Sequence, residues 1–364
     1  MIDKHYKIHR ATTGDFHSSA ENILQSVTSA GLYPLRILFF ADINSNEEYI
    51  EKKVQLREQC EAHFGAKMPL MALVAQAPLR CTLAAEVTYI DNSCVGQIVH
   101  NGDYVTLDDE IISAGVASDI SQSIDRQADE IFKRVEEILH QENCQTEDIT
   151  RQWNYIEQIT LMSESGQHYQ LFNDSRSRFY SKAEWTNGYP AATGIGTSAG
   201  GVIVVFDAVR DSAKCSLAVD NPLQISAHAY SQQVLINRGT EHKSTPKFER
   251  ARYISTPTPS VYVSGTAAIR GEESCLKDAV GQAALTMENI DCLVSAKNLQ
   301  ASGVKQSVYM QYGAMRAYLK HGSDTQKVSA WISENYPQVD MLYLLADICR
   351  EELLIEIEGV VVAR

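Results

Sequence analysis

The segment Leu353–Val362, LLIEIEGVVV, decides the fold of this chain. Its aliphatic and β-branched residues predict a buried β-strand. Because side chains alternate along a strand, Glu356 and Glu358 share one otherwise apolar face. A carboxylate without access to water tends to take up a proton or find a partner, and such acids are frequent in active sites. The alternative is an edge strand with both glutamates in solvent.

Composition limits the function. The chain has 364 residues, 44% of them apolar, and a net charge of −14. It is long enough for a large core, and its charge argues against nucleic acid or an anionic membrane as a partner. No apolar run approaches the roughly 20 residues of a membrane span, and the first residues, MIDKHYKIHR, do not resemble a signal peptide. Eight isolated cysteines without a CxxC pair indicate a reduced compartment and no structural zinc. We therefore expect a cytoplasmic protein.

A pattern of helices and strands occurs three times. We expect a truncated repeat over residues 1–92, a second repeat with insertions over 93–240, and a C-terminal repeat over 241–364. Apolar residues at helical spacing mark the first helix of each repeat. Each repeat ends in an apolar strand, which predicts related α/β units around a pseudo-threefold axis. Chance similarity of α/β segments is the alternative. The expected helices are 20–30, 46–64, 121–140, 276–296 and 327–334, and the expected strands are 35–42, 82–90, 153–159, 202–209, 260–270, 307–312 and 353–362.

Several common catalytic patterns are missing from the sequence. Gly194, Gly196, Gly200 and Gly201 precede a strand instead of opening a helix, so we expect a turn and close backbone approach to a small ligand, not a phosphate loop. Histidines 5, 9 and 17 lie in a polar N-terminal stretch that we expect to be solvated. There is no HExxH and no GxSxG elbow. Covalent or metal catalysis has little support.

In the third repeat, SGTAAIRG (264–271), QAALTMENI (282–290) and LLIEIE (353–358) resemble, in that order, motifs of the RidA (YjgF/UK114) family. The whole chain more specifically resembles the chorismatases, enzymes built on that fold. This resemblance implies RidA/YjgF-like repeats with mixed sheets backed by helices and a site between repeats. The segments that carry it are WNYI (153–156), GYPAATGIGT (188–197), NPLQISAHAYS (221–231), FERA (248–251) and ADICREELLIEIEG (346–359).

The resemblance implies a reaction in which the enolpyruvyl group of chorismate leaves as pyruvate. An enol ether is activated by protonation of its terminal methylene carbon, which requires a well-placed proton donor and no metal or cofactor. A buried glutamic acid with a raised pKa suits that task. The resemblance assigns it to Glu356, although strand periodicity alone does not distinguish Glu356 from Glu358.

Chorismate has two carboxylates, which arginine binds well through two parallel hydrogen bonds. Arg250, within FERA, is the first candidate, and Arg350 is the second, with a surface arginine as the alternative for Arg350. RidA proteins have an arginine after the proline that precedes the closing strand, but here Pro337 is followed by Gln-Val-Asp. This difference argues against RidA-type hydrolysis of enamine or imine acids. Further substrate-binding candidates within matched motifs are Tyr189, Gln224, Tyr230 and Gly265.

Cys349 precedes Glu356 by seven residues. A cysteine here resembles the hydroxybenzoate-forming chorismatases, where the hydrolytic branch has an aliphatic residue, so we expect 3-hydroxybenzoate and pyruvate as products. A small polarisable thiol can assist proton movement; a merely buried cysteine is the alternative. Simple hydrolysis to a dihydroxycyclohexadiene carboxylate and a non-catalytic RidA-like protein that binds small carboxylates remain alternatives. Three repeats in one chain predict a monomer, because RidA trimers form their sites between subunits.

Overall fold

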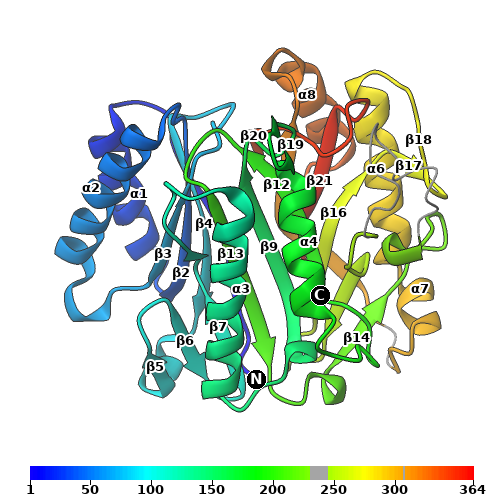
Figure 1. Cartoon of the computed structure of the whole chain (residues 1–364), viewed down its shortest axis with the longest axis horizontal. Helices are drawn as coiled ribbons and strands as arrows, with labels where there is room; N and C mark the ends of the chain where they lie inside the picture. Colours follow the sequence, from blue (N-terminus) through cyan, green and yellow to red (C-terminus); the bar gives the residue numbers. More distant parts are fainter. Residues whose placement is uncertain (230–244, 306–307) are drawn as a thin grey trace.

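The computed structural model describes residues 1–229, 245–305 and 308–364. Within them, three large β-sheets follow one another along the chain, and helices lie on their outer sides (Figure 1). In the described residues no helix is both long and apolar enough to cross a membrane.

The first sheet has the strand order β1-β4-β2-β3 and is covered by two helices. Helix α1 begins where the Asp15 side chain accepts a hydrogen bond from the backbone N–H of Ser18. Ser45 caps helix α2 in the same way at Glu48. The bounds are β1 His5–Ala11, α1 Phe16–Thr28, β2 Tyr33–Ala41, α2 Asn46–Phe64, β3 Leu70–Val74 and β4 Leu83–Ile90.

The second sheet has the order β12-β9-β13-β7-β6-β5, with β8 paired to β13. Helices α3 and α4 cover one of its faces (Figure 1). The bounds are β5 Ile98–His100, β6 Tyr104–Leu107, β7 Glu110–Ser113, β8 Val116–Ala117, α3 Ile124–Gln141, β9 Ile149–Glu157, α4 His168–Tyr180, β12 Ala191–Thr197 and β13 Val202–Val209; β10 Met162–Ser163 and β11 Gly166–Gln167 form a separate hairpin.

The third sheet has the order β14-β15-β16-β21-β19-β20. The bounds are β14 Ser216–Val219, β15 Ala251–Ile254, β16 Ser260–Ala267, α6 Ala279–Leu293, α7 Ala296–Ala301, β19 Met310–Leu319, α8 Thr325–Asn335, β20 Asp340–Leu345 and β21 Ile355–Ala363; β17 Ile269–Arg270 and β18 Glu273–Ser274 form a small ribbon.

One arrangement of four strands recurs in all three sheets. It is β1-β4-β2-β3 in the first, β7-β13-β9-β12 in the second and β16-β21-β19-β20 in the third. In each set the first two pairings are antiparallel and the last is parallel. The first repeat contains this arrangement, but its sheet has four strands where the other two sheets have seven and six, so the description of the first repeat as truncated stays a prediction. Strands β1 and β3 were not predicted, because β1 is polar and β3 is short.

The closing strand β21 lies inside the third sheet, between β16 and β19. Ile355, Ile357 and Val361 pack into the core that also holds residues of α6 and α8, whereas Val360 faces the core shared with the other sheets. The alternation predicted from the sequence is therefore confirmed. Glu356 is 7% exposed and Glu358 is 0% exposed, so the alternative of a solvated edge strand is wrong.

A buried cluster of charges joins the sheets. It contains one arginine from each of the equivalent strands β2, β9 and β19, and one acid from each of β4, β13 and β21. Arg36 pairs with Asp207 of the second sheet, and Arg316 contacts Glu86 of the first sheet at 3.2 Å. Burial alone would raise the pKa of Asp207, but the neighbouring guanidinium groups hold it below its ordinary value. The members of this charged core are Arg36, Arg151, Arg316, Glu86, Asp207 and Glu358.

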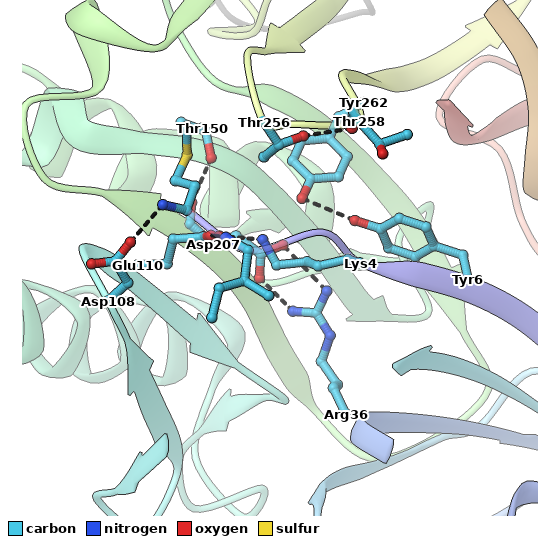
Figure 2. Close-up of polar contacts among 12 residues, drawn as sticks. Lys4, Tyr6, Arg36, Asp108, Glu110, Thr150, Asp207, Thr256, Thr258 and Tyr262 are labelled. Carbon is cyan, nitrogen blue, oxygen red and sulfur yellow. Dashed lines mark hydrogen bonds and ion pairs between the residues drawn. The ribbon is translucent and has the colours of Figure 1, made fainter. Parts of the chain in front are cut away.

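The N-terminal segment lies against the second and third sheets (Figure 2). Lys4 pairs with the buried Glu110, and the hydroxyl groups of Tyr6 and Tyr262 are 3.3 Å apart. His9 is buried in β1, where Nδ1 contacts Ser26 Oγ at 2.8 Å and Nε2 contacts a tyrosine hydroxyl. The expectation that this whole stretch is solvated is therefore wrong, although His5 and His17 are exposed.

The four glycines for which a turn was expected lie in two different elements. Gly200 and Gly201 have φ angles of +95° and +66° and form the predicted turn. Gly194 and Gly196, in contrast, belong to strand β12. Glycine has a low strand propensity, which hid this strand in the sequence.

Candidate active site

A cavity of about 680 Å³ lies between the second and third sheets. Helix α4 and strand β12 supply one side, and β16, β21 and the segments before them supply the other. The lining residues that bear on chemistry are Tyr169, Asn173, Thr193, Arg250, Gly265, Cys349, Arg350 and Glu356.

An irregularity in β16 makes room for Glu356. The register between β16 and β21 shifts between Val263 and Thr266, which is the mark of a β-bulge. Gly265 lies in this bulge and lines the cavity. A Cβ atom at Gly265 would overlap the Glu356 carboxyl and approach Thr193 Cγ2 to 3.0 Å. The missing side chain at residue 265 is therefore what lets the carboxyl group occupy this position.

Glu356 is a buried acid that holds a proton near neutral pH. Burial raises its pKa to about 8, and the charge of Glu358 acts in the same direction. Arg250 and Arg350 oppose this rise without cancelling it. A carboxyl group of this kind can donate a proton inside the cavity, which an ordinary ionised glutamate cannot do at pH 7.

Glu358 has a different environment and is not among the residues that line the cavity. It pairs with Arg316 at 2.9 Å and accepts hydrogen bonds from the hydroxyl groups of Thr193 and Tyr318. The geometry therefore separates two glutamates that the sequence left interchangeable.

Both predicted arginines line the cavity. Arg250 is buried, donates to the carbonyl of Ile225 at 2.6 Å and lies 5.6 Å from the centre of the Phe248 ring. Arg350 is half-buried and donates to the carbonyl of Glu272 and to Ser274 Oγ. Both guanidinium groups are thus held in place at the wall of one cavity, which suits a ligand with two carboxylates.

Cys349 also lines the cavity. Burial raises the pKa of its thiol to about 12, and the nearby Glu356 acts in the same direction. The group is therefore a neutral thiol at physiological pH and not a thiolate nucleophile.

The remaining predicted residues lie elsewhere. Tyr189 and Gln224 do not line the cavity. Tyr189 stacks on Tyr180, with ring centres 5.9 Å apart, and Gln224 bonds to Asn221 and to the carbonyl of Ile269. Gln224 thus contacts the cavity wall through Ile269, which lines it. Tyr230 lies outside the described residues.

The cavity wall formed by α4 and β12 was not predicted from the sequence. Tyr169, Phe172, Arg176 and Phe179 recur at intervals of three or four residues, which was a usable sign of helix α4. Polar residues between them obscured it. In the described part of the chain, no group of three or more histidine, cysteine, aspartate or glutamate side chains could hold a metal ion.

Comparison with solved structures identifies the fold. The whole chain superimposes on a crystal structure of a chorismatase with a TM-score of 0.74, covering 99% of this chain and 98% of that one at 19% sequence identity. This confirms the predicted α/β fold with mixed sheets backed by helices, which is the fold of that chorismatase.

The sequence matches cover a smaller part of the chain than the structural match does. Residues 89–208 match the family model of the N-terminal region of FkbO/Hyg5-like chorismatases. A 3-hydroxybenzoate synthase of Streptomyces hygroscopicus is 31% identical over 223 residues, or 58% of this chain and 63% of that protein. A chorismatase of Streptomyces rapamycinicus is 30% identical over 221 residues, or 58% and 64%. The aligned part thus spans less than two thirds of each curated relative. Over these residues the chain is similar in sequence to chorismatases, and its fold matches that of a chorismatase.

Proposed function

We propose that the protein cleaves the enolpyruvyl ether of chorismate and releases pyruvate, with 3-hydroxybenzoate as the main aromatic product. The observation that carries this proposal is the Glu356 carboxyl group, which lines a cavity and whose pKa is raised to about 8. Its proton goes to the terminal methylene carbon of the enol ether. The resulting oxocarbenium-like centre is then open to capture by an oxygen nucleophile.

The arginines fit the substrate. Chorismate is a dianion at neutral pH, and Arg250 and Arg350 lie at the wall of the same cavity as Glu356. A guanidinium group binds a carboxylate through charge-assisted hydrogen bonds, so two of them orient the enol ether relative to the proton donor. We assign Arg250 and Arg350 to this role.

The fate of the cationic centre decides the product. Capture by water gives a dihydroxycyclohexadiene carboxylate and pyruvate and consumes one water molecule. Capture by the ring hydroxyl group leads to hydroxybenzoate and pyruvate without net consumption of water. The neutral thiol of Cys349 in the cavity wall, together with the 3-hydroxybenzoate synthase among the relatives, supports the second route.

The test is to incubate the purified protein with chorismate and to measure pyruvate with lactate dehydrogenase. The Glu356→Gln variant should lose about 10²–10⁴ in rate, because glutamine has nearly the same shape but no acidic proton. Glu351→Gln, an exposed change on the same rim, is the matched control. No pyruvate from the unaltered protein, with chorismate still bound, would instead support a binding protein.

A further inference from the structure

Glu358 receives donors on both of its carboxylate oxygens. Tyr318 and Arg316, both on β19, reach Oε1, while Thr193 on β12 donates to Oε2. The pKa of Glu358 is raised, because burial outweighs the guanidinium group and the two hydroxyl groups that act against it. Arg316 can only donate and both hydroxyl groups donate as well, so this set of contacts suits the carboxylate form of Glu358.

Thr193 connects this carboxylate to the cavity. Its Oγ1 donates to Glu358 and accepts a hydrogen bond of 2.8 Å from the backbone N–H of Gly265. Gly265 is the residue over which the Glu356 carboxyl lies, with no room for a side chain between them. A continuous set of contacts thus runs from Glu358 through Thr193 and Gly265 to the surroundings of Glu356.

Glu358 is also the nearest like charge to Glu356 along the strand. Residues i and i+2 of a strand lie on one face, about 7 Å apart. Arg316 divides its contacts between Glu358 and Glu86, and the charge of Glu358 still acts to raise the pKa of Glu356. Among the described residues, the titratable and charged groups that interact with Glu356 are Glu358, Arg250, Arg350, Cys349 and Tyr169. Those that interact with Glu358 are Arg316, Tyr318, Arg151, Tyr155 and Glu356.

We propose that Glu358 is a positioning residue that keeps the proton on Glu356 through its charge and fixes the bulge at Gly265 through Thr193. This inference rests on the proposed role of Glu356 as proton donor and extends it to a residue outside the cavity. Two carboxylates on one strand thus have separate tasks, because one is ionised and fully partnered while the other faces the substrate space.

The first test measures the proton on Glu356 directly, without turnover. Side-chain carboxyl groups labelled with ¹³C-glutamate are titrated by NMR in the unaltered protein and in Glu358→Gln, and the signal missing from Glu356→Gln identifies residue 356. A like charge about 7 Å away, at an effective dielectric constant of about 20, accounts for about 1 to 2 pH units. Glu358→Gln should therefore lower the pKa of Glu356 by about that amount. The upper pH limit of kcat should shift downward with it.

The second test separates position from charge. Thr193→Val keeps the shape of the side chain and the charge of Glu358 but removes the link to Gly265. We expect kcat to fall about tenfold or more with a smaller change in KM, because geometry and not substrate binding is altered. Thr193→Ser, which restores the hydroxyl group, should recover most of kcat. If Glu358→Gln does not fold, this pair decides the proposal.

A merely structural role for Glu358 predicts less folded protein with an unchanged titration of Glu356. An unchanged Glu356 titration in a folded Glu358→Gln protein, or full activity of Thr193→Val, would overturn the proposal. If the unaltered protein releases no pyruvate, the proposed function fails, yet the NMR titration still tests the electrostatic effect of Glu358.

Discussion

Glu356→Gln should make the folded protein more stable, and increasingly so as the pH rises. The pKa of Glu356 is raised from 4.5 to about 8 in the folded protein. Between these values the folded state binds a proton that the unfolded state has lost, so each pH unit lowers the free energy of unfolding by roughly 1.4 kcal/mol. Glutamine does not titrate, so the unfolding free energy of the variant does not fall with pH for this reason.

The size of this change in unfolding free energy follows from the pH interval between the two pKa values. From pH 4.5 to pH 7 the group costs about 3 kcal/mol of stability, and the cost levels off above pH 8. Below pH 4 the acid is protonated in both states, and the variant and the unaltered protein should unfold alike. Exposed glutamates contribute little to stability. The unfolding free energy of Glu351→Gln should therefore stay within about 0.5 kcal/mol of that of the unaltered protein at every pH.

The measurement is urea unfolding followed by tryptophan fluorescence at a series of pH values from 4 to 9. The difference in unfolding free energy between Glu356→Gln and the unaltered protein should grow from about pH 4.5 to about pH 8 and then level off. A difference that is constant with pH, or a variant that loses stability toward pH 8, would refute the raised pKa of Glu356. The Glu351→Gln protein reports any general effect of charge removal.

Three further predictions concern the cavity. Gly265→Ala should reduce pyruvate release at least tenfold, because the added methyl group would overlap the Glu356 carboxyl group. The control is Gly96→Ala, where a Cβ atom meets nothing within 4 Å, and its activity should be unchanged. Equal activities of the two variants would exclude crowding at the bulge. Arg250→Ala should raise KM for chorismate about tenfold or more, since a charge-assisted pair is lost, and a rise of less than twofold would remove Arg250 from the site. Cys349→Ala should shift the product ratio from 3-hydroxybenzoate toward the dihydrodiol in chromatography of the reaction mixture, and a dihydrodiol as the sole product of the unaltered protein would contradict the assigned route.

Monomeric state, the domain bounds and a cytoplasmic location remain predictions from the sequence. Light scattering of the purified protein tests the first of these, and an obligate trimer would contradict it.

Elements with strong periodicity were predictable from the sequence. Helix α3 buries Ile131, Val135 and Leu139, as their spacing indicated, and β21 alternates as expected. Strand β1 was missed because its lysine, histidine and arginine residues hide the apolar ones; pairing with β4 stabilises it regardless. The local sequence pattern indicates which face of a strand is buried, but it does not indicate which distant strand pairs with it.

The same limit applies to the site. Glu356 and Glu358 are equivalent by strand period, and only contacts with remote residues separate them. Glu358 is bound by Arg316, 42 positions away in the sequence, and by Thr193, 165 positions away. The bulge at Gly265, in contrast, leaves Glu356 facing the cavity. Short motifs pointed to Arg250 and Cys349, which line the cavity, and equally to Tyr189 and Gln224, which do not. A motif does not indicate which of its side chains face the cavity.

The charged core has a consequence for how the molecule unfolds. Arg36 has its carboxylate partner on the second sheet, and Arg316 has one on the first. Separating any sheet from the others would leave an ionised group without its counter-charge in an apolar interior, at a cost of about 3–5 kcal/mol for each broken pair. Intermediates with one sheet detached should therefore be scarce. We expect the three repeats to melt in a single cooperative transition and fragments that contain one repeat to remain unfolded.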